Sequence, residues 1–297
     1  MAIKTSFSIK DLENLSGVKA HTIRIWEKRY SILEPERTDS NIRTYNVANL
    51  QKLLNVVTLN NNGFKISKIS KFTETELRDK VKNLTVENNE NKVALVDFKL
   101  AMLNFDQELF ERTYHKLSEE KSFRDIFLND FMWLLEDIGN LWSTSTITPM
   151  HERFISTLIK QKVLVNIEKV QSLRKSNSKV FALFLPLNEL HDIGLLYLHF
   201  ELILKGYNSV FLGAGIPIEN LQELQKVHDE ITYVSYFTIE PKVDSVEAYL
   251  LDFQDKVLSI KGEELHLFGK NALSVSDNLL PEGVKVHKRL LELINVL

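Results

Sequence analysis

The first 72 residues have apolar positions at helical spacing, interrupted by short polar turns. Ser8 is typical of a helix N-cap, and the Ser16-Gly17 pair is typical of a helix end. The pattern predicts helices at about 9–16, 19–29, 47–61 and 66–72, and a polar wing at 35–46. Two short helices joined by a glycine-containing turn and followed by a wing predict a winged helix-turn-helix domain over residues 1–72.

The next hundred or so residues keep the helical period. Residues 73–92 are charged and rich in asparagine, with only a thin apolar stripe, and they predict a linker. Beyond them glycine and proline are scarce, and helices are predicted at about 93–103, 106–118 and 122–141, with a fourth from Thr148-Pro149. Four helices joined by short loops predict a four-helix bundle over residues 93–175.

The last part of the chain changes to continuous apolar runs, which are typical of buried parallel strands. Strands are predicted at 179–185, 208–213, 231–239, 264–268 and 283–287, and helices at about 194–205, 218–228, 244–259 and 288–297. Strands alternating with helices predict a flavodoxin-like, doubly wound parallel sheet over residues 176–297. The predicted fold class of the whole chain is therefore α followed by α/β.

Composition narrows the class of protein. Hydrophobic residues make up 44% and charged residues 26% of the 297 residues, as in an ordinary soluble protein of two or three domains. The absence of cysteine excludes disulfides, thiolate metal sites and cysteine nucleophiles. No stretch is apolar for long enough to span a bilayer, and the N-terminus lacks a signal-peptide core. We therefore expect a cytoplasmic location and no membrane partner.

Charge is unevenly distributed along the chain. The net charge is −3, yet residues 1–72 contain eight Lys and four Arg against six Asp and Glu. A basic end on an otherwise acidic chain predicts contact with a polyanion there, and double-stranded DNA suits the predicted fold.

The basic residues of the predicted domain fall into two groups. The first lies near the start of the second helix, where helix-turn-helix proteins meet base edges, and comprises Lys19, His21, Thr22 and Arg24. The second suits phosphate contact from exposed positions and comprises Arg29, Arg37, Arg43 and Tyr45. A single such residue is more often a solvated surface charge, but the whole set on one motif favours DNA binding. Trp26 is predicted to face the core.

A second candidate site follows the first predicted strand, in the run Glu189-Leu-His191-Asp192-Ile-Gly194. Open α/β sheets bind ligands at this crevice. A histidine there suits axial ligation of a cofactor metal, because the nearby carboxylate can fix the imidazole tautomer and the glycine allows close approach of a bulky ring. The alternative is that His191 is an ordinary hydrogen-bonded histidine. A site for a simple metal ion is not supported, because no distant pair of ligands has suitable spacing in the sequence.

Two parts of the chain also resemble known protein families. Thr22-Ile-Arg24-Ile-Trp26-Glu-Lys-Arg29-Tyr30, with Pro35-x-Arg37 and Arg43-x-Tyr45, resembles MerR-type regulators over residues 6–72. The resemblance implies a second helix in the major groove, a wing on the backbone and a homodimer or higher homo-oligomer.

Residues 95–297 resemble the cobalamin-binding module of methionine synthases, corrinoid carrier proteins and light-responsive MerR-type repressors, whose pattern is acidic-x-His-x-x-Gly. The resemblance implies cobalamin as cofactor and His191 as the lower ligand of cobalt. The implied cofactor-binding residues are Trp142, Glu152, Glu189, His191, Gly194, Gly213, Ser235 and Gly269.

The chain also departs from that pattern. Arg153 replaces a histidine, Lys270 replaces the second glycine of a pair, and Ser143 replaces a histidine of the light-sensing branch. Ser235 fits the Ser-x-Leu element of the nucleotide tail only loosely.

Three hypotheses follow. The first is a transcriptional regulator that is not an enzyme, with a cobalamin sensor controlling oligomerisation and operator binding. The second keeps DNA binding but has a degenerate, cobalamin-free module controlled by a protein partner such as an antirepressor. The third, a corrinoid methyl-carrier protein, leaves the basic helix-turn-helix without a role.

Overall fold

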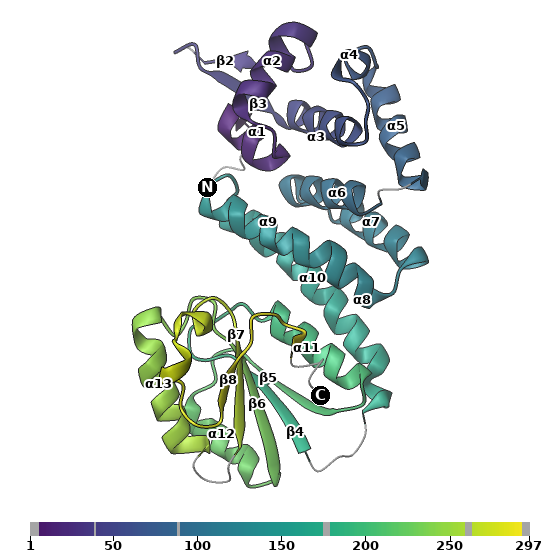
Figure 1. Cartoon of the computed structure of the whole chain (residues 1–297). Coiled ribbons are helices and arrows are strands. Elements are labelled where there is room, and N and C mark those ends of the chain that lie inside the picture. Colours follow the sequence, from purple (N-terminus) through teal and green to yellow (C-terminus); the bar gives the residue numbers. More distant parts are fainter. Residues whose placement is uncertain (1–5, 39, 88–89, 175–178, 259–262, 293–297) are drawn as a thin grey trace. The chain divides into compact units, whose positions relative to one another are not determined.

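The computed structural model of the chain describes residues 6–38, 40–87, 90–174, 179–258 and 263–292 (Figure 1). The chain forms two compact units, Met1–Leu158 and Ile159–Leu297, which we call the helical unit and the sheet unit. In the described parts of the chain, no helix combines the length and the apolar character needed to cross a membrane.

The helical unit begins with the predicted winged helix-turn-helix, which we call the head (residues 6–72). Its elements are β1 (Ser6–Phe7), α1 (Ile9–Ser16), α2 (Ala20–Tyr30), β2 (Glu36–Arg37), β3 (Arg43–Asn46), α3 (Val47–Asn61) and α4 (Ile66–Ile69). The N-cap of α1 is Ser8, which forms a reciprocal capping box with Asp11, and Gly17 ends the helix at a φ of 72°. The strands form a small antiparallel sheet in the order β1-β3-β2. Trp26, predicted to be in the core, is only half-buried, and Ile23 is the buried side chain of α2.

The rest of the helical unit is a set of packed helices. They are α5 (Glu74–Glu87), α6 (Glu90–Asn104), α7 (Gln107–Glu120), α8 (Phe123–Ile126), a π-helical turn (Phe127–Phe131), α9 (Met132–Ser143) and the first part of α10 (Pro149–Val170), whose residues from Ile159 on belong to the sheet unit. Segment 73–92 differs from the predicted linker, because α5 is helical and buries Leu77 and Val81 beside α3. The boundaries proposed for a separate bundle at 93–175 stay a prediction.

The sheet unit contains five parallel strands in the order β5-β4-β6-β7-β8. The strands are β4 (Lys179–Phe184), β5 (Asn208–Gly213), β6 (Glu230–Tyr236), β7 (Glu264–Phe268) and β8 (Val284–Val286). The helices between them are α11 (Ile193–Leu204), α12 (Ile218–Gln225) and α13 (Val246–Phe253), the last continued by a π-helical turn (Gln254–Leu258). This strand order confirms the predicted flavodoxin-like fold.

The last predicted helix, 288–297, differs: residues 288–291 form bends and turns, and 293–297 lie outside the described residues.

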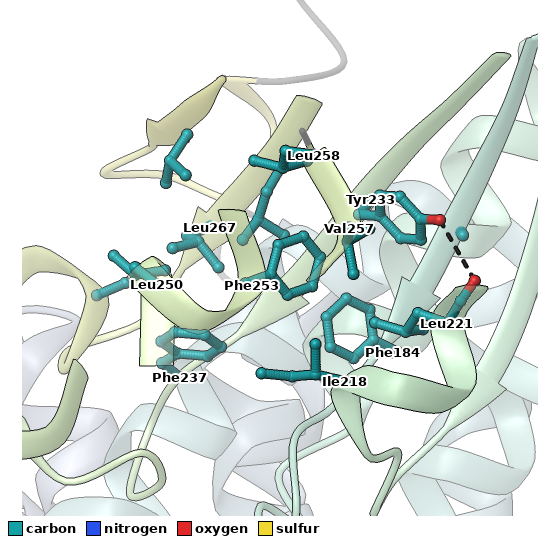
Figure 2. Close-up of a cluster of buried hydrophobic side chains, with 14 of the residues drawn as sticks. Phe184, Ile218, Leu221, Tyr233, Phe237, Leu250, Phe253, Val257, Leu258 and Leu267 are labelled. Carbon is teal, nitrogen blue, oxygen red and sulfur yellow. Dashed lines mark hydrogen bonds between the residues drawn. The ribbon is translucent and has the colours of Figure 1, made fainter. Parts of the chain in front are cut away.

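Two hydrophobic cores make the sheet doubly wound. Leucines of α11 pack with Phe181, Leu183 and Phe268 on one face. On the other face α12 and α13 pack over Phe184, and the Tyr233 hydroxyl donates to the backbone oxygen of Leu221 at 3.4 Å (Figure 2). The connections after β4 and β6 therefore leave toward opposite faces, and open α/β sheets bind ligands in the crevice at the carboxyl ends of such neighbouring strands.

Candidate DNA-binding surface and cofactor site

Helix α2 presents a basic face to solvent. The predicted residues Lys19, His21, Arg24 and Arg29 are exposed, and Thr22 is partly exposed. Lys28, which the prediction did not include, is exposed as well. His21, Arg24 and Lys28 are spaced by three and four residues, so they share one side of the helix. This spacing was the signal that would have found Lys28.

The wing differs from the prediction at Tyr45. Its side chain is 1% exposed, and its hydroxyl donates to Glu27 Oε2 at 2.9 Å, so the predicted exposure of Tyr45 is wrong. Burial and the Glu27 carboxylate raise the pKa of the Tyr45 hydroxyl. Arg43 Nε donates to the other oxygen of Glu27 at 2.9 Å, and Arg37 on β2 remains exposed and donates to Asn41. Thus Glu27 joins the wing to α2.

This role of Glu27 could hardly be predicted from the sequence. An acidic residue inside a basic helix weakens the local positive charge, so charge counting alone disfavours it. Arg43 and Tyr45 are two residues apart on one strand, and side chains at that spacing point to the same side. The tertiary approach of β3 to α2 supplies the common acceptor.

The loop after β4 is organised around the buried carboxylate of Glu189. Its Oε1 accepts from the backbone N–H groups of Leu190 and His191 at 2.9 and 3.0 Å, and lies 2.5 Å from His191 Nδ1. Its Oε2 accepts from three consecutive backbone N–H groups after β6, at residues 238, 239 and 240, over 2.7–3.1 Å. One carboxylate therefore ties together the two loops that flank the crevice.

This environment fixes the protonation of Glu189 and the orientation of His191. Burial alone would raise the pKa of the Glu189 carboxyl, but the hydrogen bonds from His191 and the backbone outweigh it and lower the pKa to about 2. Because the carboxylate is the acceptor, Nδ1 of His191 carries the proton. The His191 side chain is 48% exposed, and Nε2 is the ring nitrogen through which such a histidine ligates a metal.

The other predicted cofactor-binding residues of the sheet unit lie in different environments. Gly194 lies beside the Tyr236 ring, which a Cβ at position 194 would meet at 3.6 Å. Gly213 has a φ of 87° in open space. Ser235 is buried, and its hydroxyl donates to the backbone oxygen of Phe184 at 2.8 Å. Gly269 packs so closely on Phe237 that a Cβ would lie 2.5 Å from its backbone oxygen.

Trp142 and Glu152 belong to the helical unit. Trp142 lies in the last turn of α9 and is 53% exposed, and Glu152 lies in the first turn of α10. Arg153 Nε lies 3.9 Å from Glu152 Oε2, so the two side chains form a loose ion pair. Ser143 follows Trp142 at the end of the same helix.

Comparison with known families matches two segments of the chain. Residues 7–76 match the MerR HTH family regulatory protein model, and residues 95–165 match the B12 binding domain model. The chain therefore combines a MerR-type helix-turn-helix domain with a B12-binding domain. The head described above is the MerR-type domain, and the helices bearing Trp142 and Glu152 lie in the B12-binding match.

Individual proteins agree with this assignment. The chain is 27% identical to the HTH-type transcriptional repressor CarH of Myxococcus xanthus, over 74% of this chain and 75% of that protein. It is 29% identical to the HTH-type transcriptional regulator MlrA of Escherichia coli, over 24% of this chain and 29% of that protein. The monomethylamine corrinoid protein of Methanosarcina barkeri superposes with a TM-score of 0.54 at 16% identity, over 72% of this chain and 97% of that one, which shows a shared fold.

The described residues around His191 fit a B12 cofactor. His191 is exposed and fixed by Glu189, and the loops beside it expose the apolar side chains of Leu187, Leu190 and Ile239. Among the described residues, no three His, Asp or Glu side chains gather to hold a metal ion.

Proposed function

We propose that the protein is a DNA-binding transcriptional regulator whose B12-binding domain binds a cobalamin and thereby controls operator binding. The observation that carries the proposal is the buried Glu189 carboxylate, which holds His191 as an oriented ligand at the crevice. The repressor CarH, which matches most of this chain, supports the DNA-binding part. The protein acts in the cytoplasm as a homodimer or higher homo-oligomer and is not an enzyme.

On the DNA side, α2 enters the major groove with its exposed N-terminal residues Lys19, His21, Thr22 and Arg24 toward the bases. Arg29, Arg37 and Arg43 contact phosphates, which supplies the salt-dependent part of the affinity. Tyr45 contributes by holding Glu27 rather than by touching DNA, because its side chain is buried.

On the cofactor side, His191 would hold the cobalt of a cobalamin through Nε2, and Gly194 and Gly213 would let the backbone come close to the cofactor. Trp142 and Glu152 of the helical unit would also help to hold it. The cobalamin would supply a cobalt ion whose ligands can change between signalling states. Binding that favours one arrangement of the chains changes the spacing of the DNA-binding domains, and so changes operator affinity.

The cofactor part is tested by visible absorbance. Full-length protein is titrated with adenosylcobalamin and methylcobalamin, and unbound cobalamin is removed by gel filtration. We expect the wild type to retain cobalamin with a shifted spectrum, and His191→Ala to lose the shift. His115→Ala, a change at an exposed histidine of the helical unit, is the control and should behave as wild type. Absence of cobalamin from the wild-type fraction at micromolar concentrations would refute the cofactor part.

The DNA part is tested with duplexes selected from a random library. We expect Arg24→Ala to lose sequence preference and Arg43→Ala to weaken binding to all sequences alike. Equal and small effects of both changes would contradict the assigned roles.

A second candidate function is DNA-binding regulation without a cofactor, controlled by an antirepressor protein. The packing at the predicted tail positions favours it, since the Ser235 hydroxyl is already bonded to the backbone and Gly269 lies against Phe237. This candidate predicts a wild-type protein that binds duplex DNA but retains no cobalamin, and a partner protein whose addition releases the DNA.

A further inference from the structure

Helix α1 of the MerR-type domain makes a direct contact with the loop that joins α9 to α10. Asn14 Nδ2 donates to Thr146 Oγ1 at 2.9 Å, although the two residues are 132 positions apart in the sequence. Thr146 is buried, and its hydroxyl also lies 2.9 Å from the Thr144 hydroxyl. A polar contact between buried and half-buried groups is costly to leave unmade, so it holds the two elements together.

A buried lysine makes a second contact between the head and the helices that follow it. Lys99 on α6 is 8% exposed, and its Nζ is paired with Asp137 on α9 and lies 3.5 Å from the backbone oxygen of Leu15, near the end of α1. A buried ammonium group needs partners on every side that water cannot reach. Lys99 therefore depends on α1 as well as on α9.

The loop that receives Asn14 is short and internally bonded. Its backbone N–H at Thr146 donates to the Leu141 oxygen at 2.9 Å. The hydroxyl of Thr148 lies 2.9 Å from Nδ1 of His151, which is buried at the start of α10. Trp142 precedes this loop by two residues and Glu152 follows it by four. The backbone N–H of Thr144 donates to the Trp142 oxygen, and the Thr144 hydroxyl contacts that of Thr146, so a displacement of Trp142 is passed to Thr146 through two hydrogen bonds.

We propose that the contacts of Asn14 with Thr146 and of Lys99 with Leu15 couple the cofactor-binding residues of the helical unit to the DNA-binding head. The proposal rests on the proposed function, and it names how that function is regulated within one chain. Trp142 and Glu152 bracket the loop, so a cofactor held by these side chains would act directly on the loop. Asn14 and Lys99 would pass a resulting shift of the loop to the head. They are positioning residues, since neither touches DNA or cofactor.

The test compares the operator affinity of full-length protein with and without adenosylcobalamin, measured by fluorescence anisotropy on a duplex selected from a random library. The coupling ratio is the quotient of the two dissociation constants, and allosteric couplings are typically about 5–150-fold. We expect Asn14→Ala and Thr146→Val to move this ratio toward one by at least about threefold, the effect of one lost hydrogen bond. Their cobalamin spectra should stay those of wild type. Asn104→Ala, a change at an exposed asparagine of α6, is the matched control and should keep the wild-type ratio.

A second measurement reports directly on the contact of Asn14 with Thr146. Hydrogen exchange of the peptide covering residues 141–148 should speed up in Asn14→Ala, with or without cobalamin. A wild-type ratio retained by both variants would overturn the coupling and leave the proposed function intact. A wild type that retains cobalamin but has a ratio of one overturns the coupling together with the regulatory part of the proposed function.

Discussion

Replacing Glu189 by glutamine separates the charge of this side chain from its size. The carboxylate accepts six hydrogen bonds, three at each oxygen. An amide has one oxygen and one NH2 group, so in either orientation three N–H groups face another donor. The substitution therefore breaks the connection on one side of the crevice, even though the volume is unchanged.

The size of the effect follows from the pKa of Glu189. Hydrogen bonds outweigh the opposing effect of burial and lower that pKa to about 2, from an ordinary value of 4.5. Such a lowering corresponds to about 3 kcal/mol of stability in the ionised form. Because the pKa is lowered in the folded state, this stability is present above about pH 5 and is lost as the pH falls toward 2.

The assay is hydrogen exchange measured on peptides that cover residues 186–192 and 236–241. At pH 7 we expect Glu189→Gln to speed exchange in these peptides by about 100-fold, the factor that about 3 kcal/mol of local stability implies. Urea unfolding of the sheet unit should show a comparable loss. Glu282→Gln, at an exposed glutamate of the same unit, is the control and should change the free energy of unfolding by less than about 0.5 kcal/mol. Wild-type exchange in both peptides of Glu189→Gln would refute the reasoning.

Three further predictions concern other residues. Glu27→Ala removes the acceptor of a buried tyrosine hydroxyl and should cost the head about 2 kcal/mol, measured by urea unfolding. Glu27→Ala should also weaken DNA binding, and to a greater extent than Glu27→Gln does. Tighter DNA binding by both variants would contradict the role of Glu27 in positioning the wing. Gly269→Ala should cost roughly 3 kcal/mol, because its Cβ would lie 2.5 Å from the Phe237 oxygen at a φ of 99°. Gly213→Ala, at a φ of 87° in open space, should cost only about 1 kcal/mol in the same urea assay. Equal losses of stability in Gly213→Ala and Gly269→Ala would contradict the predicted clash with Phe237. Burial lowers the pKa of His266 from 6.5 to about 4, so the folded state keeps it neutral while the unfolded chain binds a proton. Thermal unfolding should therefore show the sheet unit losing stability as the pH falls from 6.5 to 4, less steeply in His266→Gln.

The order of helices and strands could be predicted because apolar periodicity reports it directly. The strands and helices of the sheet unit follow the predicted alternation up to β8. Helix α5 was missed because two or three apolar residues in a charged, asparagine-rich segment give a weak pattern. Its Leu77 and Val81 are buried by tertiary contact with α3, which no local pattern contains.

Within the candidate sites, sequence spacing pointed to candidate side chains but not to most of their hydrogen-bond partners. Glu189 and His191 are two residues apart, so their hydrogen bond was predictable. The three N–H groups that complete the environment of Glu189 come from residues 238–240, some fifty positions later, and no residue type marks them. Tyr45 was misplaced for the same reason, since its burial depends on Glu27 from another element.

At both candidate sites, one glutamate carboxylate accepts hydrogen bonds from two separate loops or elements. Glu27 accepts from two side chains of the wing and so fixes the wing on α2. Glu189 accepts from two loops and so fixes the histidine between them. In each case the acidic residue opposes the simplest electrostatic expectation, because Glu27 lies on a helix with exposed basic residues and Glu189 is buried. Each carboxylate accepts from several donors, which makes the position of a neighbouring Arg or His depend on a single acidic side chain. Charge-removing, size-conserving changes at these two glutamates therefore measure how far positioning, rather than the contact residues themselves, sets affinity for DNA and for cofactor.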